Sequence, residues 1–124
     1  VNQTCPHMPE GIEAFNALHR SSLGRAAVVG VFNGSAQEAR KYQLEQGIRF
    51  RLIADPDLNL IDALGIVRAS EFQVIYQGKV LGKFEGFGQG TFEAAVAMAA
   101  DATNRPKWQI PPGMPARPRA GCGF

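Results

Sequence analysis

Apolar residues recur at helical spacing near the start of the chain and form short continuous runs after it. Over residues 6–21, Ile12, Phe15 and Leu18 lie three positions apart, with Ala14 and Ala17 beside them. This spacing predicts a helix that Gly24 ends. The run 26–32, AAVVGVF, is almost entirely apolar. Such a run is typical of a strand that is buried on both faces of a mostly parallel sheet.

Turn and capping signals place the next elements. Asn33-Gly34 turns the chain, and Ser35 and Glu38 have the spacing of a capping box. In that motif each side chain accepts a hydrogen bond from the other residue's backbone N–H at the helix start. We therefore expect a helix over residues 36–46 that Gly47 terminates.

The second half of the domain continues the alternation of helices and strands. Its expected elements are a strand over 50–54, a turn at 55–57, a short helix over 58–64 closed by Gly65, strands over 72–76 and 79–84, and a helix from 92 to about 102 capped by Thr91. Gln77-Gly78 between the last two strands is a tight-hairpin signal, so these strands should be antiparallel neighbours.

Prolines dominate the C-terminal part. They stand at positions 106, 111, 112, 115 and 118, and they exclude further regular structure. The chain therefore divides into a domain over residues 1–103 and an extended, proline-rich C-terminal arm over residues 104–124.

Composition limits the classes of function. A chain of 124 residues with 45% hydrophobic residues supports one domain with a single core. The net charge of +2 is dispersed, so no nucleic acid is expected as a partner. No apolar run is long enough for a transmembrane segment. Because the chain begins almost at its most informative motif, we expect a leader or membrane anchor before Val1.

That motif is Thr4-Cys5-Pro6-His7-Met8. A cysteine at the start of a helix is stabilised as the thiolate by unpaired backbone N–H groups and the helix dipole. Cys5 is therefore the leading catalytic candidate, with Thr4, Pro6, His7 and Met8 as active-site neighbours. A dithiol motif of the C-x-x-C kind needs a second cysteine where this chain has Met8, and a thioether cannot resolve a mixed disulfide.

The order of elements, together with five short motifs, resembles the redoxin branch of the thioredoxin fold, which includes the alkyl hydroperoxide reductase and thiol-specific antioxidant proteins. The motifs are Thr4-Cys5-Pro6-His7, Val28-Val29-Gly30-Val31, Ile53-Ala54-Asp55-Pro56, Ala63-Leu64-Gly65-Ile66 and Val74-Ile75-Tyr76-Gln77-Gly78-Lys79-Val80. The resemblance covers residues 4–100. It implies an α/β fold, a three-layer α/β/α sandwich with a mixed central sheet, whose first strand is largely missing from this sequence.

Three departures from the family pattern bear on activity. Met8 replaces the resolving cysteine, and Asn2 stands where peroxide-reducing members have a Thr or Ser. Ser70 falls at the position of the family's cis-proline. Because a non-proline cis bond costs about 3 to 4 kcal/mol, the Ala69–Ser70 bond should be trans and the loop remodelled. Arg68 is a catalytic candidate by resemblance to an arginine that polarises peroxide, with a solvated loop arginine as the alternative.

Cys5, His7 and Met8 form a soft ligand set that suits Cu(I), so copper handling is a distant alternative. His19 is the only other histidine and lies at the far end of the first helix. We favour the interpretation that His7 is a variable residue of the motif and that Met8 marks a lost thiol. No metal and no cofactor are therefore expected.

Cys122, between Gly121 and Gly123, is the second catalytic candidate. At ~3.3 to 3.6 Å per extended residue, the arm is long enough to bring Cys122 to Cys5. The alternative is that the arm lies on a partner protein and buries Trp108, Ile110 and Phe124 there. We favour the partner-bound arm, since the losses at the active site weaken the case for an internal resolving thiol.

The functional hypotheses are therefore a protein related to thiol-disulfide or peroxide redox chemistry, with that chemistry weakened or lost, and a non-catalytic thioredoxin-fold subunit of a larger complex. The sequence does not decide whether the domain is an enzyme. An active domain would be a thiol-dependent oxidoreductase or a peroxiredoxin-like protein. The resemblance to reductases of extracytoplasmic compartments favours a periplasmic or membrane-associated location over a cytoplasmic one.

Overall fold

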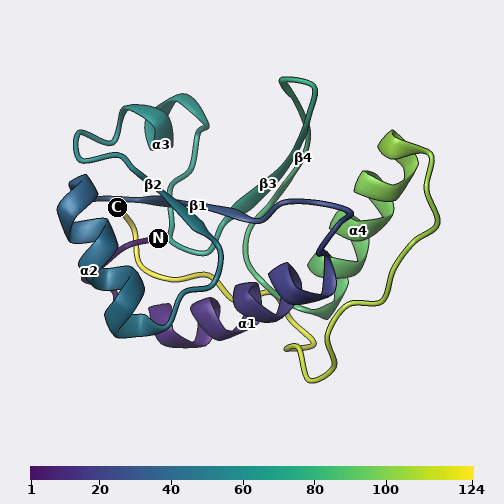
Figure 1. The fold of residues 1–124 in the computed structure, drawn as a ribbon, viewed down its shortest axis with the longest axis horizontal. Coiled ribbons are helices and arrows are strands. Elements are labelled where there is room, and N and C mark those ends of the chain that lie inside the picture. Colours follow the sequence, from purple (N-terminus) through teal and green to yellow (C-terminus); the bar gives the residue numbers. More distant parts are fainter.

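The computed structural model describes residues 1–124 as a mixed α/β structure (Figure 1). Its elements in chain order are α1 (Met8–Ser21), β1 (Val29–Phe32), α2 (Ala36–Gln46), β2 (Arg51–Ala54), α3 (Asn59–Ala63), β3 (Phe72–Tyr76), β4 (Lys79–Phe84) and α4 (Gln89–Thr103). The predicted order of helices and strands is confirmed, and the predicted bounds of α2, β3 and β4 are the observed ones.

The strands form two separate pairs. β1 and β2 are parallel, in register from Val29 opposite Arg51 to Phe32 opposite Ala54, and β3 and β4 are antiparallel. Gln77 and Gly78 between β3 and β4 have φ values of 50° and 77°, and two successive positive φ angles are what the favoured two-residue hairpin turn requires. The predicted antiparallel pairing of β3 and β4 is confirmed.

The expected mixed central sheet is wrong in that β1 and β3 do not share one sheet. Next to the unpaired edge of β1 lies only Val1, whose nitrogen donates to Val31 O at 2.6 Å and whose carbonyl accepts from Asn33 N at 3.2 Å. β1 is also only partly buried, with Val29 46% exposed, so the expectation of a strand buried on both faces is wrong as well.

Two apolar clusters form the core. One cluster joins α1, α4 and the arm: Ala14, Leu18, Phe87, Phe92, Val96, Ala100 and Trp108. The other surrounds the start of α1: Cys5, Met8, Ile12, Ile48, Phe50 and Ala69. Phe15 packs against both clusters, and its ring makes edge contacts with Phe50, Phe72 and Phe87. The two pairs of strands are therefore held together by side chains from α1 and the arm.

Two helix starts differ from the prediction. α1 begins at Met8 rather than at Pro6, because Met8 N donates to Cys5 O in a turn that precedes the helix. α4 begins at Gln89 with Gly88 as its N-cap, so Thr91 lies in the first turn and is not the cap. The Thr91 hydroxyl instead donates to the carbonyls of Gly86 and Gly88.

The capping box of α2 is formed as predicted. Glu38 N donates to Ser35 Oγ at 3.1 Å, Ser35 N donates to Glu38 Oε1 at 3.0 Å, and Gly47 ends the helix in the left-handed conformation. The hydrogen bonds from Ser35 N and then from the Gln3 amide hold the pKa of the Glu38 carboxyl below its ordinary value.

We expect Ser35→Ala to lower the free energy of unfolding by about 1 kcal/mol, because one N-terminal N–H of α2 loses its acceptor. Urea unfolding followed by circular dichroism measures this change. Ala36→Ser, one position further along the exposed start of α2, is the control and should change stability by less than about 0.5 kcal/mol. Equal stability of Ser35→Ala and the parent would contradict a stabilising role of the box.

Candidate functional site

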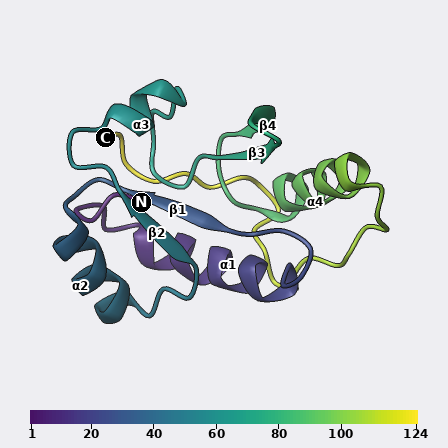
Figure 2. The same cartoon turned by 45° about the horizontal axis from the view of Figure 1, so that its top comes forward.

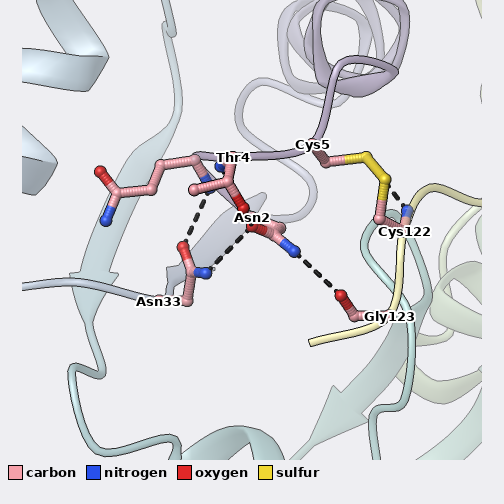
Figure 3. Close-up of a disulfide and its surroundings, with 7 residues drawn as sticks. Asn2, Thr4, Cys5, Asn33, Cys122 and Gly123 are labelled. Atoms are coloured by element: carbon pink, nitrogen blue, oxygen red, sulfur yellow. Dashed lines mark hydrogen bonds between the residues drawn. A yellow bond between two sulfur atoms is a disulfide. The ribbon is translucent and has the colours of Figure 1, made fainter.

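Cys5 and Cys122 form a disulfide that joins the two ends of the chain (Figure 3). Their Cα atoms are 5.7 Å apart, at a sequence separation of 117. Cys122 N also donates to Cys5 Sγ at 3.1 Å. Cys5 is 5% exposed, whereas Cys122 is only partly buried. The preference for an arm bound to a partner is therefore corrected, since the arm folds back on its own domain.

Backbone hydrogen bonds hold the end of the arm along the loop before β3. Gly121 N donates to Ala69 O at 2.7 Å, Ala69 N donates to Cys122 O at 2.8 Å, and Phe124 N donates to Val67 O at 3.1 Å. In Figure 2 the arm passes between the part that carries β1 and the part that carries β3. The hydrogen bonds that Gly121 and Ala69 donate therefore hold the backbone of Cys122 beside Cys5.

A second contact lies further back along the arm, at the loop between β4 and α4. Phe87 and Arg119 exchange two backbone hydrogen bonds, each of 2.9 Å, and the Arg119 side chain forms an ion pair with Glu10 of α1. A Cβ at Gly86 would overlap the Arg119 carbonyl, and a Cβ at Gly88 would lie 3.0 Å from Pro115 O. The glycines of this loop therefore permit the close approach of the arm.

Aromatic side chains anchor both ends of the arm in the two cores. Trp108 is 9% exposed, and its Nε1 donates to Ser22 Oγ at 3.0 Å. Ile110 packs against the same cluster, and Phe124 packs against the cluster that contains Cys5. Trp108 is therefore buried within its own chain and not, as had been predicted, on another one, while Ile110 and Phe124 are partly buried by this chain.

Gly121 shows why a small residue precedes the second cysteine. A Cβ at this position would lie 3.0 Å from Ala69 Cβ and 3.2 Å from Cys5 Sγ, both tighter than ordinary contact. Gly121 therefore leaves space for the sulfur of Cys5.

Asn2 links three segments around the disulfide and is 4% exposed. Its Oδ1 accepts from Thr4 N at 3.1 Å, from Thr4 Oγ1 at 2.9 Å and from Asn33 Nδ2 at 3.1 Å. Its Nδ2 donates to Gly123 O at 3.1 Å. In the sequence, Asn2 stood out only because it lacks the hydroxyl of the Thr or Ser that peroxide-reducing members have at this position. Its closeness to Cys5 was visible in the sequence, but its partners at positions 33 and 123 were not.

The other candidates lie around this site without forming one cluster. The Arg68 side chain is exposed, and its backbone forms a bridge with Gly123. The bond before Ser70 is trans as predicted, and Ser70 has a φ of 68°, with its buried hydroxyl lacking a hydrogen-bond partner. Thr4, Pro6 and His7 are exposed, and Met8 is buried in the cluster with Cys5.

A hollow of about 400 Å³ opens where the arm crosses α1. It is lined by His7, Glu10, Phe87, Pro118, Arg119 and Ala120. His7 and Ala120 each lie two positions from a cysteine of the disulfide, so the hollow borders the site, although neither cysteine lines it. No group of three or more His, Cys, Asp or Glu side chains is placed to hold a metal ion.

Comparisons with family models, with curated proteins and with solved structures found no match. None of the four helices is long and apolar enough to cross a membrane. The chain is thus a mixed α/β protein with a disulfide between its N-terminal motif and its C-terminal arm.

Proposed function

We propose that this chain is a thioredoxin-like protein of the redoxin branch, in which Cys5 and Cys122 form a reversible thiol-disulfide couple. The observation that carries the proposal is the placement of Cys122 beside Cys5 by the folded arm. Cys122 supplies the second thiol that Met8 does not. The split into two pairs of strands departs from the three-layer sandwich of that family, and the parallel pair, the hairpin and the helix that follows Cys5 support the assignment.

The exchange begins at Cys122, because its side chain is the more accessible of the two. An external thiolate attacks Cys122 Sγ, the bond between the two sulfurs breaks, and Cys5 leaves as a thiolate. The N–H of Cys122 donates to Cys5 Sγ in the disulfide, and a hydrogen bond to the anionic form favours that form. A second external thiol then attacks the mixed disulfide at the external sulfur.

The net reaction conserves atoms and electrons. One protein disulfide and two external thiols give two protein thiols and one external disulfide, and the two protons of the external thiols end on Cys5 and Cys122. A low-molecular-weight thiol such as glutathione, or a protein dithiol, is the reductant class that this reaction needs.

Thiol exchange is favoured over peroxide reduction by the surroundings of Cys5. At the position of the peroxide-orienting hydroxyl, the Asn2 amide instead accepts three hydrogen bonds from the chain at Oδ1 and donates one at Nδ2. Arg68 has an exposed side chain and takes part in the site through its backbone. Neither residue supports the activation of a peroxide by Cys5.

The burial of Cys5 favours a second candidate function, in which the disulfide is a permanent staple of a non-catalytic binding or assembly domain. In this case Cys5, at 5% exposure, stays beneath the arm. For the permanent staple we propose an extracytoplasmic location, since lasting disulfides persist in oxidising environments and are rare in the cytosol.

A glutathione redox titration followed by thiol alkylation and mass spectrometry tests the proposed couple. We expect the linked Cys5–Cys122 peptide to disappear and return reversibly as the ratio of reduced to oxidised glutathione is raised and lowered in the native protein. If native protein stays linked in excess reduced glutathione and opens only after denaturation, the staple is correct and the reversible couple is wrong.

A further inference from the structure

We infer that Asn2 is a positioning residue that sets how readily Cys122 closes on Cys5. The inference rests on the proposed thiol-disulfide couple and adds the group that regulates it. Of the side-chain hydrogen bonds around the disulfide, the one from Asn2 Nδ2 to Gly123 O reaches the arm one residue beyond Cys122. Figure 3 shows the Asn2 side chain between Thr4 and Gly123, with the disulfide beside it.

The orientation of the Asn2 amide is set by its other partners. Its Oδ1 accepts three hydrogen bonds, two from Thr4 and one from Asn33, so the oxygen faces the N-terminal loop and the end of β1. The Nδ2 group then points the opposite way, towards the arm. Asn33 is fixed in turn, because its Oδ1 accepts from Gln3 N at 3.0 Å. A rigid amide therefore presents one donor to the arm.

This donor acts at the end of the arm that must move when the disulfide opens. After reduction, Cys122 is kept near Cys5 only by noncovalent contacts of residues 115–124, which include the bonds to Ala69, Val67 and Phe87. Each contact that survives reduction holds the Cys122 thiol close to Cys5 and so raises its effective concentration there. A short linker has the same effect on the second binding step of two joined modules. The hydrogen bond from the Asn2 amide is one such contact, and its donor side is buried, while Gly123 is exposed.

The equilibrium between the disulfide and the two thiols thus depends on Asn2, a residue that carries no thiol. The segments that Asn2 joins are the loop before Cys5, the end of β1 and the last residues of the arm. A change at the end of β1 is transmitted to the arm through the Asn33 and Asn2 amides. The prediction is that the equilibrium between disulfide and dithiol shifts when this chain of amides is broken.

Asn2→Asp is the decisive variant, because aspartate keeps the shape and the Oδ1 acceptor while it replaces the Nδ2 donor by a carboxylate oxygen that cannot donate to Gly123 O. We expect its equilibrium constant for disulfide formation against glutathione to fall at least about threefold to tenfold, the range of one net hydrogen bond, because the anionic oxygen also repels the Gly123 carbonyl. Gln3→Ala is the matched control. Its side chain contacts Glu38 and not the arm, so its constant should stay within about twofold of the parent.

A merely structural role of Asn2 gives a different result. Loss of stability that is equal in the disulfide and dithiol forms leaves the glutathione equilibrium unchanged, even if the melting temperature falls. Asn2→Ala gives a second test with all four bonds removed, and if it does not fold, Asn2→Asp alone decides. An unchanged constant in Asn2→Asp, or an equal fall in Gln3→Ala, would overturn the inference. A parent protein that never titrates would instead overturn the redox couple itself.

Discussion

Removing the disulfide is expected to lower the free energy of unfolding by about 2 to 4 kcal/mol. The bond closes a loop with a sequence separation of 117, so it restricts the unfolded chain strongly. Loop-closure entropy alone gives almost 5 kcal/mol for a loop of roughly this length. The measured value should be smaller, because noncovalent contacts keep part of the arm in place and the unfolded chain retains some compactness.

The double variant Cys5→Ser with Cys122→Ser provides the measurement without free thiols. Its urea unfolding is compared with that of the oxidised parent, and the parent in excess reductant should behave like the variant. Trypsin then reports on the arm, where the exposed Arg119 precedes Ala120 and offers a cleavable bond, whereas the Arg117–Pro118 bond resists trypsin because proline follows the arginine. We expect cleavage in the arm to speed up in the double variant, while α1 and α4 stay protected. Equal unfolding midpoints for variant and oxidised parent would contradict the disulfide.

Local signals predicted the parts of the fold that depend on neighbouring residues. The helix over residues 36–46 was found from a capping serine, a glutamate three residues later and a terminating glycine. The Gln77-Gly78 hairpin was found in the same way. The separation of β1 from β3 into two sheets was not predictable from such signals, because it depends on pairing between residues far apart in the sequence. The continuous apolar run at 26–32 indicated more burial than the two pairs of strands supply.

The candidate site divides in the same way. Cys5 was identified from its position before a helix, and Cys122 from the length of the arm that carries it. The choice of the partner-bound arm was wrong because it was made from residues missing at the active site. The contacts that decide the question are backbone bonds from Ala69 and Phe87 to the arm. Backbone bonds carry no side-chain signature, so the nearest trace of them in the sequence is the run Gly86-Phe87-Gly88.

Filling the space at Gly86 tests the contact between this run and the arm. Gly86→Ala should lower the free energy of unfolding by about 2 to 4 kcal/mol and loosen the arm. The added Cβ would overlap the carbonyl of Arg119, which is backbone and cannot swing away like a side chain. The arm must then move off the loop, and both Phe87–Arg119 hydrogen bonds are lost.

Gly90→Ala is the matched control in the same part of the chain. A Cβ there meets no atom within 4 Å, and the residue lies in the first turn of α4. Its stability should be unchanged or raised by up to about 1 kcal/mol, since alanine favours a helix over glycine. Hydrogen exchange of the Arg119 amide separates the two variants, with fast exchange in Gly86→Ala and parental exchange in Gly90→Ala. If Gly86→Ala keeps the Arg119 amide protected, the arm does not lie against this loop, and its attachment depends on the disulfide and the 67–69 segment alone.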